Sequence, residues 1–269
     1  LFVSLFISTY KVLSWKDTAG DYISSLDTLY EMKENQVDVL FMGSSHCYCS
    51  IINANLWEEH GIASMNLSIS GQDIAGTYHT LKEALKTQKP KVVCIEAYGA
   101  AFSGYIIEGN LYRNTLPYKP SRNAYDVVEA IGTSQEEKES LWLRWPIVHT
   151  RYKELKRNDF GENPYPYLGY KAEFTTNAAL PVVWSVGEES LPMDGENEKW
   201  FRAIMELAEA EEIELCFFLA PSVEEEEHQK KYNYLKAMAE EGGFPFVNLI
   251  QMKNELGLEE ATDFVDNNH

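Results

Sequence analysis

Five short apolar runs, most of them separated by segments of helical periodicity, constrain the fold of this chain more than any other feature. The runs cover residues 37–42, 63–67, 91–97, 213–220 and 244–249. Runs of this length are typical of strands buried on both faces, and their alternation with helices indicates parallel connections. A chain of 269 residues with 45% hydrophobic content can bury such a core. The sequence therefore predicts an α/β fold, a three-layer α/β/α sandwich around a central parallel five-stranded sheet.

Helical patterns occupy the intervals between these runs. The segment 74–89 places Ile74, Tyr78, Leu81 and Leu85 on one stripe and should stop before Pro90. Similar patterns predict helices over 21–35, 51–60, 196–211 and 222–241. His79 and His228 lie on two of these helices, where surface or boundary positions are expected.

A long insertion follows the third strand and must carry structure of its own. Roughly 115 residues separate the third and fourth apolar runs, far more than an ordinary connection needs. We expect residues 100–190 to form a lid over the strand ends, within one domain covering 21–269. The insertion is rich in aromatic residues, which suit either a small helical core or a sugar-stacking surface. Its segment 164–170 is predicted to be an exposed loop.

Charge and cysteine content exclude some classes of partner and of fold. The formal net charge is −19, with 42 acidic against 23 basic residues, which argues against nucleic acid and other polyanions, anionic lipid headgroups included. Cys94 and Cys216 lie inside apolar runs and read as small buried hydrophobic residues. Cys47 and Cys49 are too close in sequence for an ordinary disulfide loop, so no disulfide-stapled fold is predicted.

The first ten residues carry no charge, and two interpretations of residues 1–20 stay open. The stretch is about half the length of the roughly 20 residues that span a bilayer, so it fits the end of a membrane anchor or signal segment. It also fits an amphipathic N-terminal helix packed on the domain. Membrane attachment through the N-terminus is therefore one expectation.

Catalytic residue types occur at two places in the chain. Ser45 follows the first apolar run, within Gly43-Ser44-Ser45-His46, and Asp266 and His269 stand at the C-terminal end. A serine at a tight strand exit faces solvent near backbone amides, and a histidine oriented by an aspartate can accept its proton. This combination indicates nucleophilic acyl chemistry. The cluster His46, Cys47 and Cys49 also suggests a metal site or a cysteine nucleophile, but no second ligand pair stands at a useful spacing, so no metal is predicted.

The order of these motifs resembles the SGNH/GDSL hydrolase superfamily. Residues 43–46, the block Asn66-Leu67-Ser68-Ile69-Ser70-Gly71-Gln72, and Asp266-x-x-His269 carry the resemblance across the whole core. The Gly-Ser-Ser-His block, Leu56-Trp57 and residues 85–90 are similar to membrane-anchored, extracytoplasmic bacterial members, several of which modify cell-envelope polymers. The resemblance implies a flavodoxin-like sheet and the same location at the cell surface, while a cytoplasmic location stays open.

Site roles follow from the resemblance. Ser45 is the implied nucleophile, His269 the general base, Asp266 its orienting partner, and the amides of Ser45 and Gly71 the oxyanion hole. The third block of the family would supply an asparagine to that hole, but this chain has Ile95-Glu96-Ala97-Tyr98-Gly99-Ala100. Gln72 and Tyr98 are the candidate replacement donors, and His46 is expected to face the substrate.

The expected function is that of a serine esterase or an O-acyltransferase without a cofactor. Water as the acyl acceptor gives an esterase, with a carbohydrate deacetylase as the expected type, and a sugar hydroxyl gives a transferase for a cell-envelope glycan. Acylated carbohydrate or another small ester is the expected substrate. The missing asparagine motivates an alternative, a non-catalytic glycan-binding or scaffold protein of the same fold.

Overall fold

The computed structural model describes residues 2–14, 25–102, 108–160, 169–170, 187–222, 226–259 and 262–264. Five parallel strands form one sheet in the order β2-β1-β3-β4-β5. The strands are β1 (Val39–Met42), β2 (Ser64–Asn66), β3 (Val92–Glu96), β4 (Glu214–Leu219) and β5 (Phe246–Asn248). Each lies within a predicted apolar run and is two or three residues shorter in total than that run. The predicted α/β class and five-stranded parallel sheet are confirmed.

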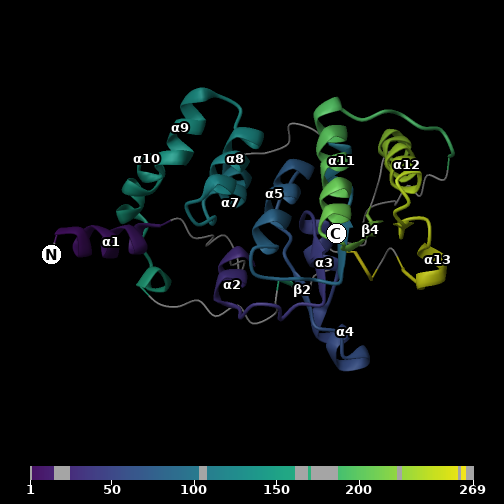
Figure 1. Cartoon of the computed structure of the whole chain (residues 1–269), viewed down its shortest axis with the longest axis horizontal. Coiled ribbons are helices and arrows are strands. Elements are labelled where there is room, and N and C mark those ends of the chain that lie inside the picture. Colours follow the sequence, from purple (N-terminus) through teal and green to yellow (C-terminus); the bar gives the residue numbers. More distant parts are fainter. Residues whose placement is uncertain are drawn as a thin grey trace.

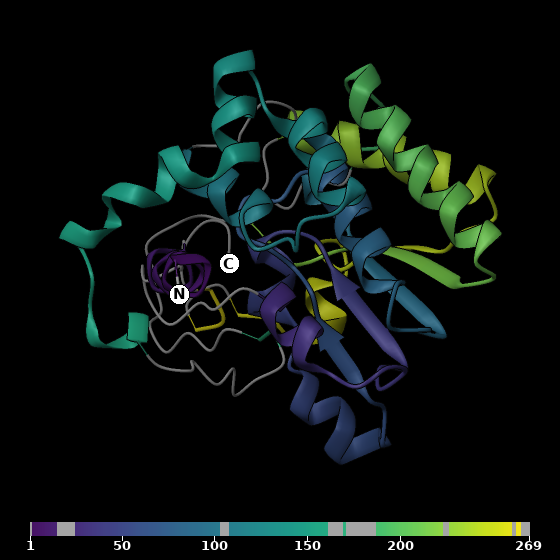
Figure 2. The ribbon, with the colours of Figure 1, turned by 60° about the vertical axis from the view of Figure 1, so that its left-hand side comes forward.

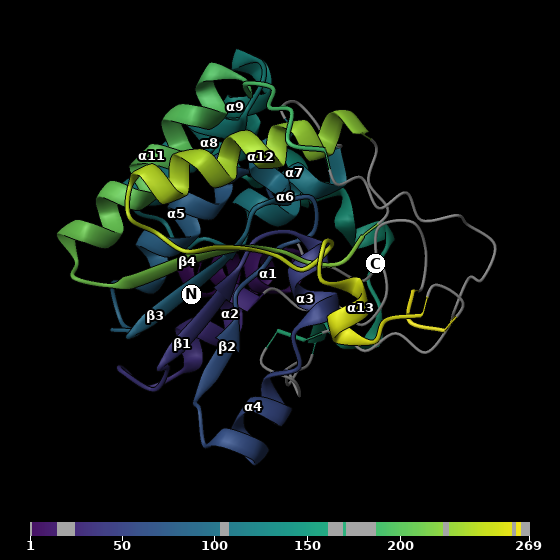
Figure 3. The same cartoon turned by 90° about the vertical axis from the view of Figure 1, so that its right-hand side faces the viewer.

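Helices cover both faces of this sheet (Figures 1 and 3). One face carries α5 (Ile74–Ala84), α11 (Gly195–Ala210) and α12 (Glu226–Glu241), and the other carries α3 (Ser45–Ser50), α4 (Asn53–His60) and α13 (Lys253–Leu256). Two further helices precede the sheet, α1 (Phe2–Leu13) and α2 (Ser25–Glu31). The helix predicted over 74–89 ends at Ala84, and a turn completes the path to Pro90. Among the described residues, every helix is too short or too polar to span a bilayer.

Side chains of the central strands alternate between a fully buried face and a half-buried face of the sheet. Val93, Ile95 and Phe217 point into the main core and are fully buried. Cys94 and Cys216 point to the opposite side, are half-buried, and form a register pair on β3 and β4 with their sulfurs 3.2 Å apart. The prediction that both side chains are buried is therefore wrong, since each is half-buried.

The first part of the insertion belongs to the helical layer. It contains α6 (Tyr98–Ala101), α7 (Glu108–Thr115), α8 (Arg122–Ile131), α9 (Gln135–Leu143), α10 (Trp145–Val148) and the 3-10 helices η1 (His149–Lys153) and η2 (Arg157–Phe160). Leu111, Tyr118 and Val127 are buried in the main core, and α8 packs on α5. This part of the expected lid is thus a fixed extension of the domain.

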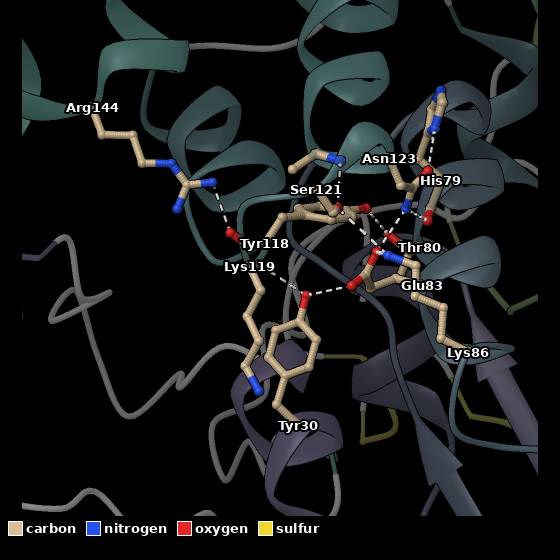
Figure 4. Close-up of polar contacts among 11 residues, drawn as sticks. Tyr30, His79, Thr80, Glu83, Lys86, Tyr118, Lys119, Ser121, Asn123 and Arg144 are labelled. Atoms are coloured by element: carbon tan, nitrogen blue, oxygen red, sulfur yellow. Dashed lines mark hydrogen bonds and ion pairs between the residues drawn. The ribbon is translucent and has the colours of Figure 1, made fainter.

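A buried polar network joins the insertion to α5 and α2 (Figure 4). The Glu83 carboxylate accepts hydrogen bonds from the Tyr30 hydroxyl at 2.9 Å, the Asn123 amide at 2.9 Å and the Lys86 ammonium at 2.5 Å. The Tyr118 hydroxyl lies 2.7 Å from the Thr80 hydroxyl. These contacts connect three helices and the turn before α8, so they fix the insertion on the sheet domain.

His79 is part of this network and is buried, contrary to the predicted surface position. Its Nδ1 lies 2.8 Å from the Asn123 side-chain oxygen, and its ring contacts Tyr78 and Trp200. The Asn123 amide nitrogen donates to the His79 carbonyl and to Glu83, so the Asn123 oxygen is the acceptor for the imidazole N–H. Burial lowers the pKa of His79, although the Asn123 hydrogen bond opposes that shift.

Candidate active site

Three neighbouring strands end at the same edge of the sheet, and this edge collects most of the predicted site residues. β1 lies between β2 and β3, and all three run parallel. Gly43, the residue after β1, has a φ of 140°, and a Cβ there would lie 2.8 Å from the Cβ of Glu96 at the end of β3. A side chain at this position would separate the strand ends. Glycine therefore lets the β1 turn approach β3 closely before α3 begins.

The two serines after Gly43 have different environments. Ser44 is the N-cap of α3 and is buried; its Oγ accepts from the His46 N–H at 3.4 Å and lies 3.3 Å from a Glu96 carboxylate oxygen, to which it donates. Ser45 is the first residue of α3 and is half-buried. Within the described part of the chain, its hydroxyl makes no hydrogen bond. Ser44 is thus committed to structure, whereas the Ser45 hydroxyl is available to a ligand.

Buried polar contacts hold the loop after β2 against α3. The Asn66 amide nitrogen donates to the Cys47 carbonyl at 3.1 Å, and its oxygen accepts from the Ser68 N–H at 3.2 Å. The Ile69 N–H donates to the Gly43 carbonyl at 3.0 Å. The loop that leads to Gly71 is therefore fixed relative to the serine turn.

Gly71 adopts the left-handed conformation, with a φ of 62°, and an asparagine amide fills the space beside it. A Cβ at Gly71 would lie 2.0 Å from the Nδ2 of Asn110, which belongs to α7. The Asn110 oxygen accepts from Arg113 at 2.9 Å, which orients the amide. Asn114, one turn later, donates to the Ser70 carbonyl at 3.2 Å and ties α7 to the same loop. The site edge thus has a side-chain amide donor beside Gly71.

Gln72, a candidate replacement donor, has both amide atoms committed elsewhere. Its nitrogen donates to the Thr80 hydroxyl at 2.9 Å, and its oxygen accepts from the Thr77 hydroxyl at 3.4 Å. The side chain is buried against α5. The side chain therefore holds the loop. The Gln72 backbone carbonyl lies 2.5 Å from the position that a Cβ of Gly99 would take, so the loop lies next to α6.

His46 and Tyr98 lie together at this edge. Their ring centroids are 3.9 Å apart, and the Tyr98 N–H donates to Glu96 at 3.1 Å. The row of rings continues from Tyr98 to Phe102 at 4.5 Å and to His228 of α12 at 4.4 Å. His46 is buried, whereas Tyr98, Phe102 and His228 are half-buried. An aromatic wall therefore extends from the serine turn toward α12.

Asp266 and His269, the predicted orienting residue and base, lie outside the described residues. The described residue nearest to them in sequence is Phe264, which is buried. Most of the predicted exposed loop 164–170 also lies outside them, but Gly169 is described. It is buried, has a φ of 96°, and a Cβ there would lie 1.7 Å from the Asn66 carbonyl oxygen, so this end of the segment is packed against the site loop.

Cysteine and metal chemistry find little support at this edge. Cys47 is fully buried, and this burial raises the pKa of its thiol well above the ordinary value, although a hydrogen bond with Ser68 opposes that shift. Over the ranges that the structure describes, no cluster of His, Cys, Asp or Glu side chains could hold a metal ion. The functional groups described at this edge are a hydroxyl, amides, aromatic rings and the buried Glu96 carboxylate.

Two residues of this edge do not follow from the sequence motifs. Glu96 anchors both Ser44 and Tyr98, and Asn110 supplies the amide beside Gly71. The carboxylate at the end of an apolar run was a signal for Glu96, since a buried charge needs partners. Asn110 carries no comparable signal, because it lies on a separate helix.

Comparison with known proteins gives no relative for this chain: no protein-family model matches it, and neither a curated protein nor a solved structure is detectably similar.

Proposed function

We propose that this protein is a serine-dependent acyl-ester hydrolase or O-acyltransferase of the SGNH type, in which Ser45 carries the acyl group. The contrast between the two adjacent serines carries the proposal. Ser44 is buried and hydrogen-bonded to Glu96, whereas Ser45 is half-buried at the carboxyl edge of a parallel sheet, where ligands of such folds bind. A nucleophilic hydroxyl has to be reachable, and of these two adjacent serines Ser45 meets that condition.

The chemistry proceeds in two acyl transfers. The Ser45 oxygen attacks the acyl carbon of the ester while a base accepts its proton, and the alcohol then leaves with that proton. Water or a second hydroxyl then attacks the acyl-serine while the base accepts its proton, and the Ser45 oxygen leaves with that proton. This step releases the acid or a new ester. The sequence offers His269 as the base and Asp266 as its orienting partner.

Charge that develops on the acyl oxygen needs hydrogen-bond donors. The amides of Ser45 and Gly71 are the backbone candidates, and the Asn110 side chain is the third. The Arg113 hydrogen bond to the Asn110 oxygen leaves the Asn110 nitrogen to donate toward the site. This arrangement weakens the argument for a non-catalytic protein, since that argument rested on a missing asparagine.

An acylated carbohydrate is the substrate class that we favour. The half-buried rings of Tyr98, Phe102 and His228 border the serine turn, and aromatic rings with polar edges suit sugar rings. The site edge also presents hydroxyl and amide groups without a described cluster of basic side chains for phosphate. A cell-envelope glycan in an extracytoplasmic location fits these features and the motif resemblance.

A fluorophosphonate probe tests the proposal. Intact-mass measurement of the wild-type chain should give one adduct, and peptide mapping should place it on Ser45 and not on Ser44. If the folded chain takes up no probe, or if the adduct maps elsewhere, the assigned nucleophile is wrong. A glycan-binding protein without catalysis would then be the better interpretation.

The Asn110→Ala variant should lower the rate of probe adduct formation and of ester hydrolysis by about 100-fold, the usual cost of one oxyanion donor. The expected loss lies in kcat, with KM nearly unchanged, because the donor acts on charge that develops in the transition state. Asn233→Ala is the control, since it removes a side-chain amide of the same size from α12, where the Asn233 nitrogen donates to two backbone carbonyls away from Gly71. Equal rates in the two variants would remove Asn110 from the oxyanion hole.

A further inference from the structure

The N-terminal helix α1 packs against residues 145–151 of the insertion. Arg151 of η1 donates to the carbonyl oxygens of Leu13, at 3.1 Å, and of Ser14, and its other nitrogen donates to the buried Asp159 at 2.8 Å. A guanidinium at the last carbonyls of α1 stabilises that helix end. The ring of Phe6 also contacts that of Trp145, with centroids 5.6 Å apart. Figure 2 shows α1 beside the teal segment that contains these residues.

Large apolar side chains are concentrated and exposed on α1 and on this part of the insertion. Seven of the thirteen exposed large hydrophobic side chains in the described residues lie here, and the other six are each on a different element or loop, so the concentration is local. We define the α1/η1 surface by these seven residues: Leu5, Phe6, Ile7, Leu143, Trp145, Tyr152 and Phe160. Exposed apolar patches of this kind mark interaction sites.

The shape of the apolar part distinguishes between classes of partner. Leu5, Phe6 and Ile7 are consecutive on α1 and are 65%, 51% and 60% exposed. Consecutive helical positions are about 100° apart, so the three cover roughly 200° of the helix circumference. A helix that docks on a protein usually presents a narrower stripe. An arc this wide fits a medium that surrounds the helix, such as the interfacial layer of a bilayer.

Local charge has the opposite sign to that of the whole chain. Residues 143–160 contain five basic and two acidic residues, although the chain carries −19. Lys11, Lys153 and Lys156 are exposed, and none of them forms an ion pair with a described residue. The Lys153 ammonium lies 5.6 Å from the centre of the Tyr152 ring, so base and aromatic stand side by side. Screening limits electrostatic reach to about 10 Å at 0.1 M salt, so a nearby headgroup responds to these lysines more than to distant carboxylates.

We propose that the α1/η1 surface docks on an anionic lipid bilayer, with the apolar and aromatic side chains in the interface and the lysines at the headgroups. Exposed leucine, phenylalanine and isoleucine, aromatic residues with polar edges, and flanking lysines are the elements of interfacial membrane binding. The net charge of the chain, taken alone, predicts the reverse, since it argues against anionic lipid headgroups. This docking is independent of the acyl chemistry, because Ser45 takes no part in it.

Flotation of the full chain with lipid vesicles tests the proposal. We expect binding to vesicles of phosphatidylcholine with phosphatidylglycerol, weaker binding to phosphatidylcholine alone, and a loss of the difference at high ionic strength. Two changes should weaken binding: Trp145→Glu, and the double variant Lys153→Glu with Lys156→Glu. Each lysine near an anionic surface contributes about fivefold to partitioning, so the double variant should bind at least tenfold more weakly.

The control is Trp57→Glu on α4, because Trp57 is 61% exposed but lies outside the α1/η1 surface. The control should bind like the wild-type chain. The charges of Lys153 and Lys156 can be reversed without disturbing the core, because both side chains are exposed. Absence of wild-type binding to either vesicle would overturn the proposal, as would an equal loss in the Trp57 variant. A concentration-dependent dimer that Trp145→Glu abolishes, without vesicle binding, would make this surface a protein interface instead.

Discussion

The Ser45→Ala variant should lose at least about 10⁴-fold in the hydrolysis of an activated ester such as p-nitrophenyl acetate, since loss of a catalytic serine nucleophile has effects of this size or larger. The acyl-serine route requires the Ser45 oxygen, and no other described hydroxyl has the same position at the strand edge. The fold should be unaffected, because the side chain is half-buried and makes no hydrogen bond to a described residue. Initial rates together with a thermal unfolding curve separate the two effects.

Ser44→Ala is the matched control for this prediction. It removes the buried hydrogen bond to Glu96 and the N-cap interaction with the His46 N–H, so stability should fall by about 1–2 kcal/mol. Its activity should remain within a few-fold of the wild-type chain at a temperature where both are folded. The reverse pattern would make Ser44 the nucleophile, and full activity in Ser45→Ala would exclude an acyl-serine on this residue.

The sheet could be predicted because its strands carry a strong and simple signal. Val39–Met42 and Val92–Glu96 are short, apolar and bordered by helical patterns, which is what a strand buried between two layers requires. The same reasoning placed Ser45 at a strand end, because parallel strands put their carboxyl ends at one edge. The local apolar pattern and the overall fold agree here, so the sequence was sufficient to predict the sheet and the position of Ser45.

Contacts between distant segments could not be predicted in this way. Asn110 lies beside Gly71 because Asn114, one turn later on α7, donates to the Ser70 carbonyl and docks the helix on this loop. The burial of His79 depends on Asn123 from the insertion, 44 residues later. Helical periodicity assigns a residue to a face of a helix, but it does not say which segment covers that face. For the same reason the sequence does not show that the apolar side of α8 packs on α5.

The Glu83 carboxylate joins the insertion to α5 and α2 through buried hydrogen bonds, so the stability of the fold should depend on it. The Glu83→Leu variant should lower the free energy of unfolding by about 2–5 kcal/mol, because it leaves the Tyr30 hydroxyl and the Asn123 amide without their acceptor in a buried place. Lys86 contributes less to the loss, since its side chain is 45% exposed and regains water. Denaturant unfolding measures the change, and an unchanged slope with a lower midpoint indicates a loss of native stability.

Glu196→Leu provides a control with the same local geometry. Glu196 pairs with Lys199 three residues later, as Glu83 pairs with Lys86, but both partners of that pair are exposed. An exposed pair of this kind contributes at most about 1 kcal/mol. Equal losses in the two variants would mean that the Glu83 contacts are no more valuable than a surface ion pair. A larger loss for Glu83 would mean that the carboxylate binds α2 and α8 to α5. Because α7 directly precedes α8 and carries Asn110, the same carboxylate would then hold the amide beside Gly71 in place.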